Sequence, residues 1–207
     1  FADQIESAMA ALHGRAANAV DVPAARRFAG TDAWRRLLDT DLDVVILATS
    51  PDARPAQMAA AVDAGRHVYC EAPAAVDAAG APVVLAACHR ARAAGLSVGS
   101  GLAWRHDAET ARAIEAIARG AIGRPMVAAV RSLIGPAWHK PRVAGMSTTS
   151  AERRNWITVP GLSGGDFVEH HVHAIDKALW AFGDESPVAA EPAAATAGEV
   201  AVRYLFA

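Results

Sequence analysis

The chain has 207 residues, of which 53% are hydrophobic and 20% are charged, and its formal net charge at pH 7 is -2. This balance excludes an intrinsically disordered chain, which needs low hydrophobicity and high net charge. It also argues against a nucleic-acid partner, because such binding rests largely on basic clusters that neutralise phosphates. No stretch is long and apolar enough to predict a transmembrane helix, so we expect no membrane partner.

The first hundred residues predict an alternation of helices and short strands. The expected helices cover 3–13, 31–38, 55–64 and 77–94, and the expected strands cover 43–49, 67–70 and 96–99. The strand at 43–49 is rich in β-branched residues and apolar at nearly every position, which is typical of a parallel strand covered by helices on both faces. The order predicts an α/β fold with a partial Rossmann-type parallel sheet.

The second half predicts a different architecture, in which strands are separated by long irregular stretches. We expect helices over 108–119 and 164–182, a polar loop over 139–160, and strands at 126–133, 188–190 and 200–206. This pattern favours a second α+β domain with a mainly antiparallel open sheet. The predicted domains are residues 1–102 and 103–207.

Both ends of the chain suggest an incomplete protein. The sequence begins at Phe1 without an initiator methionine or a secretory signal, and it stops inside the last expected strand. We therefore expect a fragment. Cytoplasmic and periplasmic locations both stay open, because an export signal would precede Phe1.

In parallel α/β sheets, ligands bind at the carboxyl ends of the strands. This rule directs attention to three short segments that follow expected strands: Thr49-Ser50-Pro51, Glu71-Ala72-Pro73 and Ser100-Gly101-Leu102. A charged residue such as Glu71 at this edge is placed to face a bound ligand.

The densest group of titratable residues lies between Glu169 and Asp176. On one continuous helix, Glu169, His173 and Asp176 share a face, where a carboxylate one turn from an imidazole suits proton transfer near neutral pH. The alternative for such a pair is a solvated polar face. A metal site that adds His170 or Asp176 also competes, but no H-E-x-x-H signature is present, and we expect no metal.

Several separated motifs, in the same order, resemble the glucose–fructose oxidoreductase/inositol dehydrogenase/MocA family. They are Asp43-Val-Val-Ile-Leu-Ala-Thr49, Ala64-Gly-Arg-His-Val68, Cys70-Glu-Ala-Pro73 and Gly164-Gly165…Glu169-x-x-x-His173-x-x-Asp176. The resemblance implies a Rossmann domain followed by a domain whose open sheet helps to build the substrate site and a homo-oligomer.

The resemblance also implies hydride transfer between NAD or NADP and a secondary alcohol of a sugar or polyol. His173 would then be the proton-transfer residue beside Glu169, and Thr49, Ser50, Pro51 and Glu71 would line the cofactor. The implied substrate contacts are Arg105, His139, Lys140, Arg154 and His170.

Two departures from the family pattern weaken this prediction. The chain has no G-x-G-x-x-G turn to hold a pyrophosphate, and Ala72 stands where many members have a catalytic lysine. A methyl group donates no hydrogen bond, so we expect impaired or no activity of this chain alone. The alternative is a non-catalytic homologue that binds a carbohydrate or a nucleotide.

Overall fold

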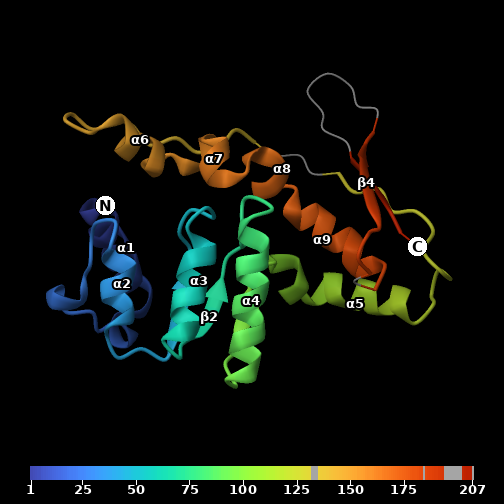
Figure 1. Ribbon diagram of the computed structural model, residues 1–207, viewed down its shortest axis with the longest axis horizontal. Coiled ribbons are helices and arrows are strands. Elements are labelled where there is room, and N and C mark those ends of the chain that lie inside the picture. Colours follow the sequence, from blue (N-terminus) through green and yellow to red (C-terminus); the bar gives the residue numbers. More distant parts are fainter. Residues whose placement is uncertain (132–134, 184, 194–201, 207) are drawn as a thin grey trace.

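The computed structural model describes residues 1–131, 135–183, 185–193 and 202–206. The chain opens with α1 (Ala2–Ala16) and α2 (Ala33–Leu38), which precede the first sheet. Figure 1 shows α1 and α2 at one end of the molecule and the antiparallel strands at the opposite end.

The first half contains the predicted parallel sheet. Strands β1 (Val44–Leu47), β2 (His67–Cys70) and β3 (Val98–Ser100) pair in the order β1-β2-β3, and all pairs are parallel. Helices α3 (Arg54–Asp63) and α4 (Gly80–Ala93) connect them. This arrangement confirms the α/β fold class.

One face of this sheet carries the core. The buried residues that pack together there come from all the elements just named except β3: Val45, Leu47, Met58, Ala61, Val62, Val68, Cys70, Ala87 and Ala91. The alternate residues of β1, Val44 and Ile46, are 54% and 69% exposed. The prediction that β1 is covered on both faces is therefore wrong for the described residues, because α3 and α4 both belong to the cluster on the Val45 face.

The second half is a chain of short helices followed by a small sheet. The strands β4 (Ala189–Pro192) and β5 (Val202–Leu205) pair antiparallel, as predicted. The helical elements are η3 (Ala103–His106), α5 (Ala108–Ala118), α6 (Thr148–Arg154), η4 (Trp156–Thr158), α7 (Pro160–Ser163), α8 (Gly165–Glu169) and α9 (Val172–Ala181). The predicted helix at 108–119 is confirmed, and Asp107 caps it by accepting from the Thr110 N–H at 2.8 Å.

Two predictions for the second half are wrong. Residues 126–131 form no strand, and residues 132 and 133 of that predicted strand lie outside the described residues. Met126 and Val127 are 78% and 87% exposed, and in the described part of the chain no strand pairs with this apolar run to give it a hydrogen-bonded ladder. The predicted loop at 139–160 contains α6 and η4, because Ser147 caps α6 by accepting from the Ser150 N–H.

The helix predicted over 164–182 is broken at His170 and His171. The carbonyl of Asp166 accepts from both the His170 N–H at 3.0 Å and the His171 N–H at 3.2 Å. The hydrogen-bond ladder therefore slips by one residue, α8 ends at Glu169, and α9 starts again at Val172. Glu169 and His173 consequently lie on two helices, and their expected spacing on one continuous helix is wrong.

Helices α6 to α8 fold back across the first half of the molecule, near the ends of α3 and α4 (Figure 1). Arg153 forms an ion pair with Asp52 at 2.7 Å, and the Asp52 N–H donates to the Leu162 carbonyl at 3.3 Å. Since Asp52 follows β1, these contacts place the 148–169 segment over the carboxyl edge of the parallel sheet. The predicted domain boundary after residue 102 stays a prediction.

Candidate functional site

The carboxyl ends of β1 and β2 hold the residues predicted to line a cofactor. The Thr49 hydroxyl donates to Gln57 Oε1 at 2.6 Å, while Ser50 is half-buried and Pro51 is buried. The Glu71 N–H donates to the carbonyl of Leu47, the last residue of β1, at 3.0 Å and so continues the β1-β2 ladder one residue past the end of β2. Register within the sheet therefore brings Glu71 beside the turn that follows β1.

Gly101 lets the side chain of Glu71 lie against the end of β3. The Gly101 N–H donates to the Cys70 carbonyl at 2.8 Å, which holds the two chain segments together. A Cβ at position 101 would overlap Glu71 Oε2 and lie 2.8 Å from the Glu71 Cα. Only glycine leaves room for the carboxylate of Glu71 in its present position.

Arg54, the first residue of α3, joins the two strand ends and was not among the predicted site residues. It is 3% exposed, and it donates to the carbonyls of Thr49 at 2.8 Å, Glu71 at 3.0 Å and Pro73 at 2.6 Å. Burial lowers the pKa of Arg54, an effect opposed by nearby anionic groups, Glu71 and Glu169 among them. One signal was available in the sequence: a cation in the first turn opposes the helix dipole, so its presence there needs a reason.

Glu169, the last residue of α8, lies close enough to Arg54 and Glu71 for their charges to act on its carboxyl group. Burial raises the pKa of Glu169 to about 7, with the charge of Arg54 lowering it and the charge of Glu71 raising it. Its Oε2 atom is buried and has no hydrogen-bond partner among the described residues. The structure thus brings together one predicted catalytic residue and one predicted cofactor residue that lie about a hundred positions apart.

His170 and His173, two of the three histidines that follow Glu169, are half-buried. His173 lies on α9, and its Nδ1 atom is buried without a hydrogen-bond partner in the described part of the chain. The Nδ1 atom of His170 lies 3.4 Å from Asp166 Oδ1. A carboxyl group with a pKa near 7 and an imidazole are both suited to move a proton at neutral pH.

Arg105, a predicted substrate contact, is engaged by Asp176. Its Nε atom donates to both carboxylate oxygens of Asp176 at 3.0 Å, and Nη2 donates to Oδ1 at 2.8 Å. The guanidinium also lies 5.1 Å from the centre of the Trp180 ring. These contacts join η3 to α9, so in this structure Asp176 serves the packing of the two elements and does not extend the Glu169–His173 pair.

The remaining predicted substrate contacts lie along the 138–156 segment. The Lys140 ammonium is 5.0 Å from the centre of the Trp138 ring, and Arg154 forms an ion pair with Asp3 at 2.5 Å. His139 is exposed. Within the described residues, no hydrogen bond or ion pair joins these side chains to Glu71 or Glu169, so the structure does not bring them into direct contact with the strand-end cluster.

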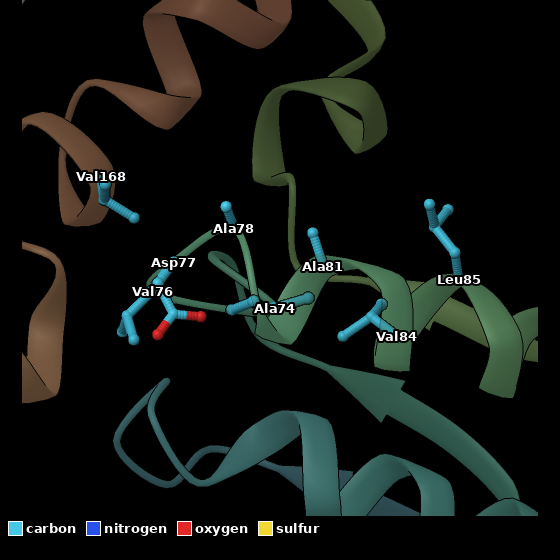
Figure 2. A pocket seen from close by; sticks show the side chains of 9 residues that line it. Ala74, Val76, Asp77, Ala78, Ala81, Val84, Leu85 and Val168 are labelled. Carbon is cyan, nitrogen blue, oxygen red and sulfur yellow. The ribbon is translucent and has the colours of Figure 1, made fainter.

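An open apolar pocket of about 560 Å³ lies next to the turn that follows β2 (Figure 2). Val168 of α8 faces it from one side, and residues between Ala74 and Leu85 form the opposite side. Asp77 is the one charged residue among those that line it, and its carboxylate accepts from the Gly80 N–H at 2.7 Å. The pocket therefore offers mainly aliphatic contacts.

The described part of the chain contains neither a candidate metal site nor a candidate membrane-spanning helix. No group of three or more His, Cys, Asp or Glu side chains lies close enough together there to hold a metal ion. None of its helices combines the length and the hydropathy that crossing a bilayer requires.

Comparison with known proteins agrees with the fold. The chain is 38% identical over 92 residues to a 1,5-anhydro-D-fructose reductase from Ensifer adhaerens, a region that is 44% of this chain and 27% of that protein. An oxidoreductase domain protein from Kribbella flavida superposes with a TM-score of 0.57 and 27% identity over 72% of this chain and 38% of that one. An aldose-aldose oxidoreductase from Caulobacter crescentus, crystallised with glycerol, superposes with a TM-score of 0.59 and 25% identity. The superposition covers 84% of this chain and 47% of that one.

In each case this chain spans less than half the length of the relative. The family model that matches covers residues 2–100 and describes an oxidoreductase family with an NAD-binding Rossmann fold. This region contains the parallel sheet, the turns after β1 and β2, and Arg54. Over residues 2–100, somewhat less than half of the chain, this protein is similar to that oxidoreductase family, in agreement with the resemblance drawn from its motifs.

Proposed function

We propose that this chain is part of an NAD(P)-dependent oxidoreductase that acts on a secondary alcohol of a sugar or polyol, or on the corresponding ketone. The observation that carries the proposal is that Arg54 joins the turns after β1 and β2 by hydrogen bonds to Thr49 and Glu71, close enough to Glu169 for the charges of Arg54 and Glu71 to act on its carboxyl group. The names of two relatives, an anhydrofructose reductase and an aldose-aldose oxidoreductase, support the substrate class.

The residues at this edge fit part of a dinucleotide site. Ligands bind at the carboxyl ends of parallel strands, where the chain places Thr49, Ser50, Pro51 and Glu71. Glu169 Oε2 and His173 Nδ1 are buried polar atoms without hydrogen-bond partners among the described residues, as expected for groups that meet a ligand. The chain has no glycine-rich turn for a pyrophosphate, so these residues alone would bind a dinucleotide weakly.

A bound NAD(P)+ would supply the acceptor for the hydride that leaves the alcohol carbon. The chain must then take the proton of the hydroxyl group, and His173 is the proposed acceptor. Glu169 would hold or release a proton beside it, because its pKa of about 7 makes both forms accessible near neutral pH. Arg105, His139, Lys140, Arg154 and His170 are the proposed substrate contacts, as the family resemblance implies.

The second candidate is a binding protein without turnover. Ala72 favours it, because its methyl group lies between Glu71 and Pro73 and neither donates a proton nor carries charge. The retained Glu169 and His173 oppose it. Both functions use the same strand-end surface, so binding alone does not separate them.

The test uses the protein from its complete reading frame. We expect NAD(P)H to bind, and NAD(P)+ to be reduced with at least one member of a panel of sugars and polyols. Glu169→Gln and His173→Asn should each lower kcat by about 10²–10⁴-fold, the usual effect of losing a general acid or base. Glu115→Gln, which removes one charge on exposed α5, is the matched control and should leave kcat unchanged.

One outcome would favour the binding protein instead. It is tight NAD(P)H binding with no turnover on any substrate of the panel, left unchanged when Ala72→Lys restores a cation at that position.

A further inference from the structure

Arg54 links two chain segments that no other described side chain joins. Its Nε atom holds the carbonyl of Thr49, after β1, and its Nη1 atom holds the carbonyls of Glu71 and Pro73, after β2. The last two carbonyls flank Ala72, so a single guanidinium fixes the turn on both sides of that residue.

Packing alone does not explain an arginine at this position. A buried cation loses its hydration, and a cation in the first turn of a helix also opposes the helix dipole. A planar guanidinium nevertheless offers several N–H groups in a fixed fork, which an apolar residue or a lysine cannot reproduce. The arrangement compensates burial of the charge by directed hydrogen bonds to three carbonyls.

We propose that Arg54 is a positioning residue, which sets the turns at 49–51 and 71–73 relative to each other and thereby places Glu71 and Ala72 against the bound cofactor. This inference rests on the proposed function for its last step. The step before it, that Arg54 orders the 71–73 turn, stands on the hydrogen bonds alone and is tested separately.

The same domain contains a matched control. Arg66 follows α3 and donates to the carbonyls of Leu42 at 2.5 Å and Thr40 at 3.2 Å, which precede β1. It therefore ties the chain at the opposite, amino-terminal edge of the sheet in the same way. Arg54→Lys and Arg66→Lys both keep the positive charge and both lose the fork, and a general loss of stability in either variant would accelerate amide exchange at both edges of the sheet.

The first measurement is amide hydrogen exchange in the protein from its complete reading frame. In Arg54→Lys we expect the Glu71 amide, which donates to the Leu47 carbonyl, to exchange at least tenfold faster. The His67 amide, which donates to the Asp43 carbonyl at the other edge, should stay within about twofold. Arg66→Lys should give the reverse pattern. Unchanged exchange at Glu71, or equal acceleration at both amides in both variants, would overturn the proposal.

The second measurement is NAD(P)H binding at a temperature where all variants are folded. Arg54→Lys should raise the dissociation constant by about tenfold, and Arg66→Lys should change it by less than about twofold. Equal effects of the two variants would reduce Arg54 to a structural residue. If the unaltered protein binds no dinucleotide, the proposed function fails, and the exchange experiment still decides whether Arg54 orders the turn.

Discussion

The two halves of the molecule bury different kinds of side chain. Between residues 44 and 101, the buried cluster is mainly aliphatic and covers one face of the parallel sheet. Between residues 103 and 206, the buried side chains in the described part of the chain are all polar: Asn155, Ser163 and Asp176. One half is held by apolar packing, and the other depends on specific hydrogen bonds.

Each of the three buried polar residues forms hydrogen bonds with the backbone or with another side chain. Asn155 accepts from the Lys140 N–H at 2.7 Å and donates to the Lys140 carbonyl at 3.0 Å, as a backbone strand would. Ser163 donates to the Val159 carbonyl and accepts from the Gly165 N–H. Apolar packing has no direction, whereas these contacts each require one partner in one place. The two halves should therefore respond differently to the same kind of substitution.

The largest effect is expected in the apolar half. Met58 is 2% exposed at the centre of the buried cluster, so Met58→Ala should lower the free energy of unfolding by about 2–5 kcal/mol through lost burial and a new cavity. Met126→Ala is the control, because Met126 is 78% exposed. Chemical denaturation of both variants measures the difference, and equal stabilities would contradict the assignment of the core.

In the polar half, the ion pair between Arg105 and Asp176 should be the most sensitive contact. Their side chains are 30% and 10% exposed. Asp176→Asn keeps the shape but removes the charge, and we expect a loss of about 1–3 kcal/mol in the free energy of unfolding. Glu115→Gln, in the exposed pair with Arg119, should cost less than about 0.5 kcal/mol. A smaller effect for Asp176→Asn than for this control would remove the distinction drawn between the two halves.

Gly101→Ala probes the edge where the two halves meet. The added methyl group overlaps the carboxylate of Glu71, so we expect a loss of about 1–3 kcal/mol in stability and weaker cofactor binding. Gly161→Ala serves as its control, since a Cβ there meets nothing within 4 Å. Thermal unfolding and NAD(P)H titration of the two variants test this prediction. Unaltered nucleotide binding in Gly101→Ala would show that the position of the Glu71 carboxylate does not affect cofactor binding.

The smallest expected effect is a dependence of stability on pH. Burial raises the pKa of Glu169 from an ordinary value of 4.5 to about 7, so the folded chain binds this proton more tightly than the unfolded chain. Its contribution to stability is present below about pH 4.5 and is lost as the pH rises to 7. Partial exposure screens the charge, so we expect a loss on the order of 1–2 kcal/mol.

Glu169→Gln should remove this part of the pH dependence. The variant should gain stability relative to the unaltered chain at pH 8 and show little difference from it at pH 4. Unfolding curves at the two pH values measure the change, and a variant that loses stability equally at both would show that Glu169 is not buried as a neutral acid.

The sequence predicted the first half better than the second for a physical reason. The parallel strands and their helices follow from runs of apolar residues and from glycines that end helices, and these are local signals. The second half depends on partners such as Asn155 for Lys140, which leave little trace in hydrophobic periodicity. The composition of residues 126–133 predicts a strand, yet Met126 and Val127 pair with no strand among the described residues.

In the candidate site too, local sequence patterns indicated some residues and missed others. Glu71 and Glu169 were identified from their residue type and their position after a strand or within a polar cluster. Arg54 was missed, because its three carbonyl partners are unrelated to any pattern around it. The sequence also placed Glu169 and His173 on one helix, whereas a slip of one hydrogen bond at Asp166 divides them between α8 and α9.

The sequence by itself determined the α/β class and the alternation of short strands and helices along the first half, and it indicated the strand ends at which we expect a ligand. Only the tertiary structure decided which side chains meet there. Arg54 contacts a carbonyl 19 residues away, and Arg105 binds a carboxylate 71 residues away. Hydrophobic periodicity and helix caps depend on residues within one or two helical turns of each other. Partners 19 or 71 residues apart come into contact only when helices and strands pack in the folded chain.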